Sequence, residues 1–78
     1  MDKYLKRIKA IIVEKTGVDP EEIEESSYFE DDLNVSELEL HDIIVAIEDE
    51  YAIEFDEEEK ENIAAVIDLV ELVVEKLE

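Results

Sequence analysis

Cysteine is absent from this 78-residue chain, and glycine and proline occur once each. Without cysteine, neither a disulfide nor a thiolate metal site can stabilise so small a protein, so its apolar residues must form a single core. The lack of cysteine also fits a reducing, cytoplasmic setting. With so little glycine and proline the chain has almost no hairpin turn signals, which argues against a β-sheet. We therefore expect one domain over residues 1–78.

Long hydrophobic segments are missing as well. No apolar run approaches the roughly 20 residues of a membrane-spanning helix. The N-terminal sequence MDKYLKRIK lacks the apolar stretch of a signal peptide. We expect a soluble, cytoplasmic protein with no membrane span.

Positive charge is scarce, with 7 basic residues against 26 acidic ones and a formal net charge of -19. Five of the basic residues lie within the first fifteen positions, so the rest of the chain is almost purely acidic. Such a surface repels nucleic acid and attracts basic patches on other proteins. The alternative is that the acidic excess only solvates the surface.

Apolar residues recur at helical spacing in three segments that are too long, and too irregular, for the alternation of a strand. Before the last of them, Asp56 precedes three glutamates and predicts a short acidic helix. Asn62 is the available cap for a last helix expected to begin near Ala64, and the alternative is that the short and last helices run together. The three apolar sets are Leu5, Ile8, Ile11 and Ile12; Leu40, Ile43, Ile44, Ile47 and Tyr51; and Ile63, Val66, Ile67, Val70, Val74 and Leu77.

The sequence thus predicts an all-α bundle of three main helices plus one short helix, in an antiparallel arrangement. A long loop, from residue 17 to residue 35, connects the first two helices. Asp19 followed by Pro20 predicts one helical turn within it. Ser27 and Glu30 have the spacing of a capping box, so we expect the loop to be ordered in pieces.

Several motifs occur in a fixed register along the chain. They include Asp32-Leu33-Asn34-Val35-Ser36-Glu37-Leu38, then Ile47-Glu48-Asp49-Glu50-Tyr51, and finally Ile63-Ala64-Ala65-Val66. In this the chain resembles the acyl carrier protein family, which reads Asp-Leu-Gly-x-Asp-Ser-Leu, Leu-Glu-Glu-Glu-Phe and Ile-Thr-Thr-Val at these places. The similarity extends over the whole length without a gap. It implies the fold of a carrier protein.

The resemblance fails at the attachment site. In the family, the serine of Asp-Ser-Leu carries phosphopantetheine, whose thiol holds the acyl chain as a thioester. Here the serine position is Glu37 and the aspartate position is Ser36. A carboxylate cannot form that phosphodiester, so we expect no cofactor at the usual site. The alternative, 4'-phosphopantetheine on Ser36, requires a shift of register that rotates the apolar face of the helix by about 100 degrees.

The local sequence favours a structural role for Ser36. Ser36 and Glu39 have the spacing of a capping box, and serine is as good an N-cap as aspartate. Glu37 then falls at the first helical position, where the helix dipole favours a negative charge by about 0.3 to 1 kcal/mol. We interpret Ser36 as a helix cap.

Acidic residues of the second helix match positions at which the resemblance implies docking against basic patches of acyl-transfer or synthase-type enzymes. The helical spacing places most of them on the exposed side. The alternative is a face that is merely solvated. The residues are Glu39, Asp42, Glu48 and Asp49.

No metal or catalytic site is expected. His41, the one histidine, lacks the companions that either chemistry needs. The series Asp32, Asn34, Ser36 resembles the start of a calcium loop, but Glu37 and Ile43 stand where that loop needs glycine and a bidentate glutamate. Three tyrosines are expected at the edge of the core: Tyr4, Tyr28 and Tyr51.

Together these features predict a protein-interaction module and not an enzyme. The leading hypothesis is a carrier-type protein of fatty acid or related thioester metabolism that docks its partners through the acidic second helix. The alternative is a structural adaptor of the same fold that binds an unrelated basic protein.

Overall fold

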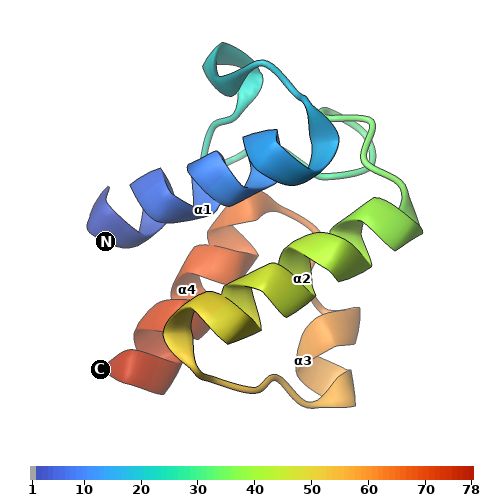
Figure 1. Cartoon of the computed structure of the whole chain (residues 1–78). Helices are drawn as coiled ribbons and strands as arrows, with labels where there is room; N and C mark the ends of the chain where they lie inside the picture. Colours follow the sequence, from blue (N-terminus) through green and yellow to red (C-terminus); the bar gives the residue numbers. More distant parts are fainter. Residues whose placement is uncertain (1) are drawn as a thin grey trace.

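The computed structural model describes residues 2–78, and within this range all the named secondary-structure elements are helical. The prediction of an all-α fold with three main helices and one short helix is confirmed. In chain order the elements are α1 (Asp2–Thr16), a 3-10 turn η1 (Pro20–Glu22), α2 (Glu37–Tyr51), α3 (Glu57–Glu61) and α4 (Val66–Leu77) (Figure 1).

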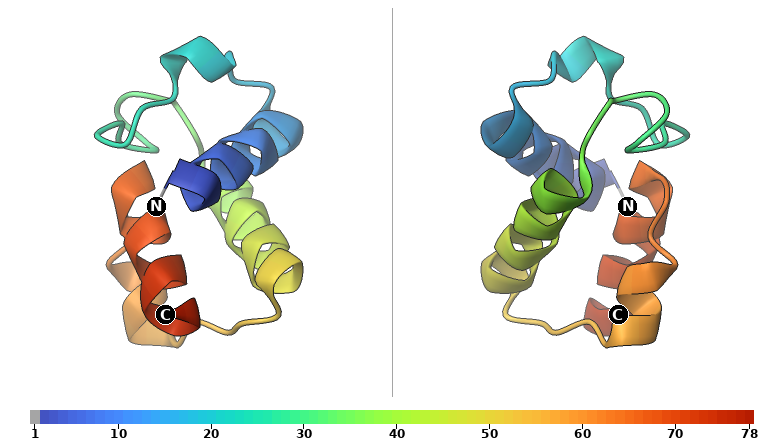
Figure 2. Two further views of the ribbon diagram at one scale, coloured as in Figure 1. Left: turned by 90° about the vertical axis from the view of Figure 1, so that its left-hand side faces the viewer. Right: turned by 90° about the vertical axis from the view of Figure 1, so that its right-hand side faces the viewer.

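The helix α1 crosses over the two other long helices and packs against both (Figure 2). It runs opposite to α2, as expected. The helices α2 and α4, however, both descend from the end of the molecule that carries η1 (Figure 1). The segment from residue 52 to residue 65, which includes α3, runs back from the end of α2 to the start of α4. The expected antiparallel order therefore holds for α1 and α2 but not for α2 and α4.

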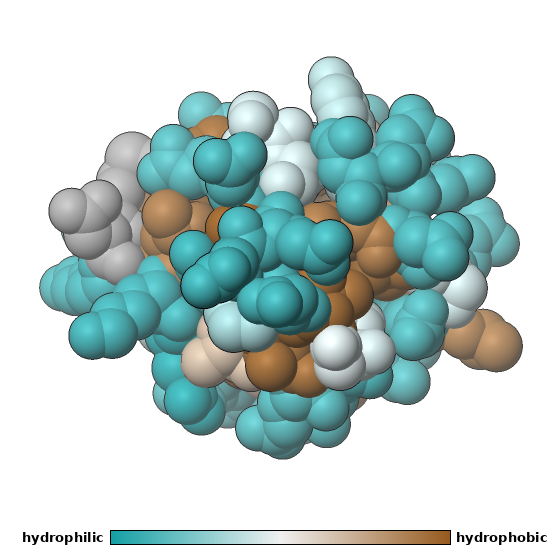
Figure 3. All heavy atoms as spheres, turned by 90° about the horizontal axis from the view of Figure 1, so that it is seen from above, coloured by the Kyte–Doolittle hydropathy of each residue, from teal (hydrophilic) through white to brown (hydrophobic). Residues whose placement is uncertain are grey.

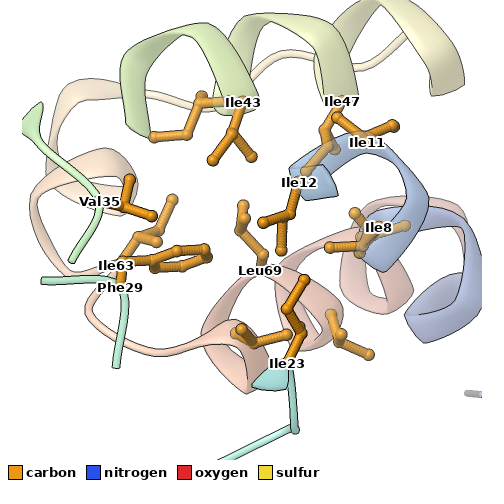
Figure 4. Packing of buried hydrophobic residues seen from close by; sticks show 14 of the residues in the cluster. Ile8, Ile11, Ile12, Ile23, Phe29, Val35, Ile43, Ile47, Ile63 and Leu69 are labelled. Carbon is orange, nitrogen blue, oxygen red and sulfur yellow. The ribbon is translucent and has the colours of Figure 1, made fainter. Parts of the chain in front are cut away.

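The core lies where the three long helices and the loop between α1 and α2 converge. Figure 4 shows Ile12 of α1, Ile43 and Ile47 of α2, and Leu69 of α4 pointing toward one another. The loop adds Phe29 to this cluster, in which all five side chains are at most 1% exposed. Buried apolar area of this kind is the main source of stability in a chain without cross-links.

Each helix boundary has a local chemical cause. Gly17, with a φ of 75°, closes α1 in the left-handed conformation, and Ala52 closes α2 in the same region without being glycine. The side chain of Asp56 accepts a hydrogen bond from the amide of Glu59, and Glu59 accepts one from Asp56, so the short helix has the expected cap. Ala65 is extended and separates α3 from α4, so the alternative of one continuous helix is wrong.

Backbone hydrogen bonds attach the loop to the start of α4. The amide of Val66 donates to the carbonyl of Ser27 at 3.0 Å, and the amide of Ile67 donates to that of Glu25 at 2.9 Å. In return, the amide of Phe29 donates to the carbonyl of Ala64 at 3.0 Å. The first amides of a helix have no partners within it. The loop therefore supplies acceptors that the sequence of α4 lacks.

Ser27 does not cap a turn with Glu30, as its spacing predicted. It is 6% exposed, its hydroxyl accepts from the amide of Glu24, and it donates to the carbonyl of Glu22. The reason is that the side chain of Ser27 is buried within the loop, where its hydroxyl makes hydrogen bonds with backbone groups of the preceding residues. The turn at Pro20 is confirmed, with the side chain of Asp19 accepting from the amide of Glu21.

Two of the three tyrosines lie at the edge of the core as expected. The rings of Tyr4 and Tyr51 meet edge to face at 5.8 Å between centroids, and join α1 to the end of α2. Tyr28 is 52% exposed, so that expectation is wrong for it. The strand-like pairing of Tyr28 with Ala65 turns the adjacent Phe29 inward, and successive side chains of an extended segment point to opposite faces.

Ion pairs join helices at the surface. Arg7 of α1 donates to Glu50 of α2 at 2.9 Å, and this hydrogen bond lowers the pKa of the Glu50 carboxyl. Lys76 of α4 pairs with Glu59 of α3 at 3.0 Å. The Arg7–Glu50 pair is exposed, so it contributes little to the free energy of unfolding, whereas the Lys76–Glu59 pair is more buried, with side chains 31% and 19% exposed. Across residues 2–78, no helix is long and apolar enough to cross a membrane.

The two faces of α2 give the first testable prediction. We expect Ile47→Ala, at a fully buried position, to lower the free energy of unfolding by about 2 to 5 kcal/mol because it leaves a cavity. The matched control is Val45→Ala on the outer face, where a change within about 0.5 kcal/mol is expected. Urea unfolding followed by circular dichroism measures both. Equal losses from the two changes would contradict this orientation of α2.

Candidate partner-docking and attachment site on helix α2

The helix α2 begins with a complete capping box. The Ser36 hydroxyl accepts a hydrogen bond from the amide of Glu39 at 3.2 Å, and a Glu39 carboxylate oxygen accepts from the amide of Ser36 at 3.0 Å. Ser36 has an extended backbone, as an N-cap requires. Just before it, Val35 is buried and its amide donates to the carbonyl of Phe29 at 2.7 Å. The predicted cap is confirmed, and the loop fixes its position.

Glu37 occupies the first turn of α2 directly after the cap, with an exposed side chain. This is the position of the family serine in the ungapped register. A carboxylate here is favoured by the positive end of the helix dipole. It offers no hydroxyl, so the position holds a stabilising charge and no nucleophile.

A hollow of about 260 Å³ lies beside these two residues, between the loop, the start of α2 and the segment before α4. Its apolar wall includes Leu40 and Ile63, and Tyr28 stands at its rim with an exposed ring. The start of α2 is thus open to a partner on one side and backed by apolar side chains on the other.

The outer face of α2 carries one ridge in which apolar and acidic side chains alternate. Leu38, Asp42, Val45 and Asp49 are spaced by four, three and four residues, which places them in one line along a helix. All four are exposed, Leu38 by 80% and Val45 by 39%. We call these four residues the α2 ridge. It faces away from the buried Ile43, Ile44 and Ile47.

The four acidic residues predicted for docking differ in whether their side chains are held by hydrogen bonds within the chain. Asp42 and Asp49 lie on the α2 ridge. Glu39 is held by its bond to the Ser36 amide. Glu48 is half-buried, and its carboxylate accepts from the amide of Phe55 at 2.8 Å, which stabilises the turn after α2. Glu39 and Glu48 therefore add charge to this face, while Asp42 and Asp49 are the more adaptable pair.

Leu38 and Val45 also belong to this surface and were not predicted as members of it. Exposed large apolar residues in line on a helix are a signal of contact with another protein. The signal was their spacing relative to Asp42 and Asp49, opposite the apolar set that faces the core. His41 lies beside the ridge and is exposed. Within the described range, no group of three or more potential ligands is arranged to hold a metal ion.

Comparisons with known proteins point to one family. Residues 6–73 match the family model described as phosphopantetheine attachment site. The chain is 39% identical over 69 residues to an acyl carrier protein of Chlamydia muridarum, an alignment that covers 88% of this chain and 90% of that protein. It is 41% identical over 63 residues to that of Wolinella succinogenes, covering 81% and 83%. It is 33% identical over 75 residues to that of Thermosynechococcus vestitus, covering 96% and 93%.

The residues at the start of α2 do not fit the attachment of phosphopantetheine at the usual position. Glu37 has no hydroxyl, and the neighbouring hydroxyl of Ser36 is one residue earlier, where it accepts from the helix amide of Glu39. Moving Ser36 into the first helical turn would break both bonds of the capping box. The position at which the family has its serine therefore offers no hydroxyl in this chain.

The cap gives the second prediction. We expect Ser36→Ala to lower the free energy of unfolding by about 0.5 to 2 kcal/mol, because the amide of Glu39 loses its acceptor. Ser36→Asp keeps an acceptor oxygen and is expected to remain within a few tenths of a kcal/mol of the unchanged protein, roughly the spread among good N-caps. Both are measured by urea unfolding. An equal loss for alanine and aspartate would exclude the capping role.

Proposed function

The chain belongs to the phosphopantetheine attachment-site family of acyl carrier proteins, and we propose that it is a docking module of that family that is not modified at the usual position. Its role is in acyl or related thioester metabolism, as a binding protein and not as an enzyme. The observation that carries the proposal is the pair Ser36 and Glu37, a helix cap followed by a carboxylate where the family has its serine.

The α2 ridge supports the docking part of the proposal. Its two carboxylates suit cationic side chains of a partner, and its two apolar side chains give such a contact a water-excluding centre. A net charge of -19 would steer basic surfaces toward it over distances longer than any single ion pair. The partner class is therefore a protein with a basic patch that surrounds an apolar spot, such as an acyl-transfer or synthase-type enzyme.

The hydroxyl of Ser36 supports a second candidate function, that of a carrier modified at this residue. That side chain is exposed and lies beside the hollow at the start of α2. If a phosphopantetheinyl transferase accepts it, the chain is a carrier of unusual register. If no transferase acts and no acyl-metabolic enzyme binds, the adaptor alternative is the remaining explanation.

Intact mass after incubation with a broad-specificity phosphopantetheinyl transferase and coenzyme A tests attachment. We expect the mass of the unchanged protein to stay the same. The double change Ser36→Asp with Glu37→Ser rebuilds Asp-Ser-Leu and is expected to gain one phosphopantetheine, localised to position 37 by peptide sequencing. The single change Glu37→Ser is the matched control for the contribution of the preceding aspartate. An adduct on Ser36 of the unchanged protein would overturn the proposal.

Charge reversal on the α2 ridge tests docking. We expect Asp42→Lys with Asp49→Lys to weaken binding to a purified synthase-type enzyme with a basic docking patch by on the order of tenfold or more, because like charges then meet. The control reverses two exposed acids of η1, Glu21→Lys with Glu22→Lys, and has the same net charge. Isothermal titration calorimetry measures both. Equal weakening by the two pairs would mean that net charge, and not the ridge, governs binding.

A further inference from the structure

The outer face of α1 is the cationic exception on this acidic protein. The helix carries Lys3, Lys6, Arg7, Lys9 and Lys15 against two acidic residues, whereas residues 17–78 contain only Lys60 and Lys76 as cations. Arg7 turns toward α2 and pairs with Glu50. Among residues 3–78, whose side chains the structure describes, Lys6 and Lys9 make no ion pair with any carboxylate inside 4.0 Å.

These two lysines flank an apolar groove. The groove has a volume of about 390 Å³ and is lined by Leu5, Lys6, Lys9, Ala10 and Val13 of α1 together with Pro20 of η1. Leu5 and Val13 are half-buried, and Ala10 is exposed. On the face seen in Figure 3, apolar side chains gather among hydrophilic ones and are not fully covered.

The groove lies beside the core, against which Leu5 and Val13 pack in part. Ile8 and Ile12, which are fully buried, form the inner face of α1, and the groove residues lie on the remaining part of the helix circumference. The α2 ridge is on another helix and shares no residue with it. Among residues 3–78, this apolar groove, bordered by cations that make no ion pair there, is thus a surface without a partner.

We propose that this groove of α1 docks an acidic amphipathic helix of another protein. The groove is open to solvent, so it can take the ridge of a helix but cannot enclose most of the surface of a small ligand. Leu5, Ala10 and Val13 would contact the apolar side chains of the partner helix. Lys6 and Lys9 would pair with its flanking carboxylates.

The charges around the groove also set the direction of the partner helix. Beyond Pro20 lie Glu21 and Glu22, both exposed, so the far end of the groove is negative. The acidic flank of the partner therefore lies over Lys6 and Lys9, and its end near η1 is neutral or basic. The overall negative charge slows the approach of an acidic protein, but salt screens that field beyond about 8 Å, whereas contacts within the groove remain.

This inference extends the proposed function and does not depend on it. The α2 ridge suits a basic partner and the α1 groove suits an acidic one, so the two surfaces can be occupied at the same time by different proteins. A failure at one surface leaves the other unaffected, because the test below uses neither a transferase nor a synthase.

The test uses a fluorescein-labelled helical peptide of about 18 residues with one leucine ridge flanked by glutamates, long enough to form a helix on binding. We expect fluorescence anisotropy to show saturable binding to the full chain. The double change Lys6→Glu with Lys9→Glu is expected to weaken binding by on the order of tenfold or more. The control Lys15→Glu with Lys60→Glu alters the net charge equally at positions that do not line the groove and is expected to bind as the unchanged protein does. Circular dichroism melts establish that both variants are folded.

Two control peptides test the apolar contact and the charged contact separately. Replacing the leucines by serine, or the glutamates by lysine, is expected to abolish binding. No binding of the acidic peptide, or equal binding by the two charge variants, would overturn the proposal. So would sedimentation showing that the chain alone self-associates through Lys6 and Lys9, since the occupant would then be a second copy. Displacement of the peptide by dodecanoate at micromolar concentration would instead assign the groove to a fatty-acid anion.

Discussion

The attachment of the loop to the start of α4 is the interaction on which the rest of this structure depends. The carbonyls of Glu25 and Ser27 accept from the first amides of α4, and Phe29 is held in the core by its own bond to Ala64. Phe29 in turn accepts from the amide of Val35, which places Ser36 at the start of α2. The cap, the hollow beside it and the α2 ridge all follow from that placement, because a helix start fixes the direction of every side chain after it.

The helices could be predicted from the sequence because each one depends on the spacing of apolar residues within a single segment. The apolar sets around Ile8, Ile47 and Val70 predicted the three main helices, and Asp56 predicted the short one. The path of the loop was not readable. Its hydrogen bonds join residues about forty positions apart, and backbone groups carry no sequence signal. Ser27 and Tyr28 were misassigned for this reason, since only the contact with α4 determines which of them is buried.

The same distinction applies to the candidate site. The capping box of Ser36 and Glu39 is local, and the spacing of the two residues predicted it. The hydrogen bond of Glu48 is less local. It depends on how the chain turns after α2, which brings the amide nitrogen of Phe55 to 2.8 Å from a Glu48 carboxylate oxygen. Leu38 and Val45 had a periodic signal, but they could be called exposed only once the inner face of α2 was known. Spacing therefore identifies faces, and packing decides which face is free.

The exchange of Asp-Ser for Ser-Glu at the start of α2 leaves the demands of the fold satisfied. An N-cap needs an acceptor oxygen, which aspartate and serine both provide, and the first helical position accepts serine or glutamate. A serine at the first helical position is therefore not required for the stability of α2. The α2 ridge begins one residue later, at Leu38, and uses other side chains. Under the proposed function, attachment and docking would therefore use different side chains of this fold. Under the proposed function, a chain that keeps the ridge and lacks the serine would occupy a partner's docking surface without delivering an acyl group.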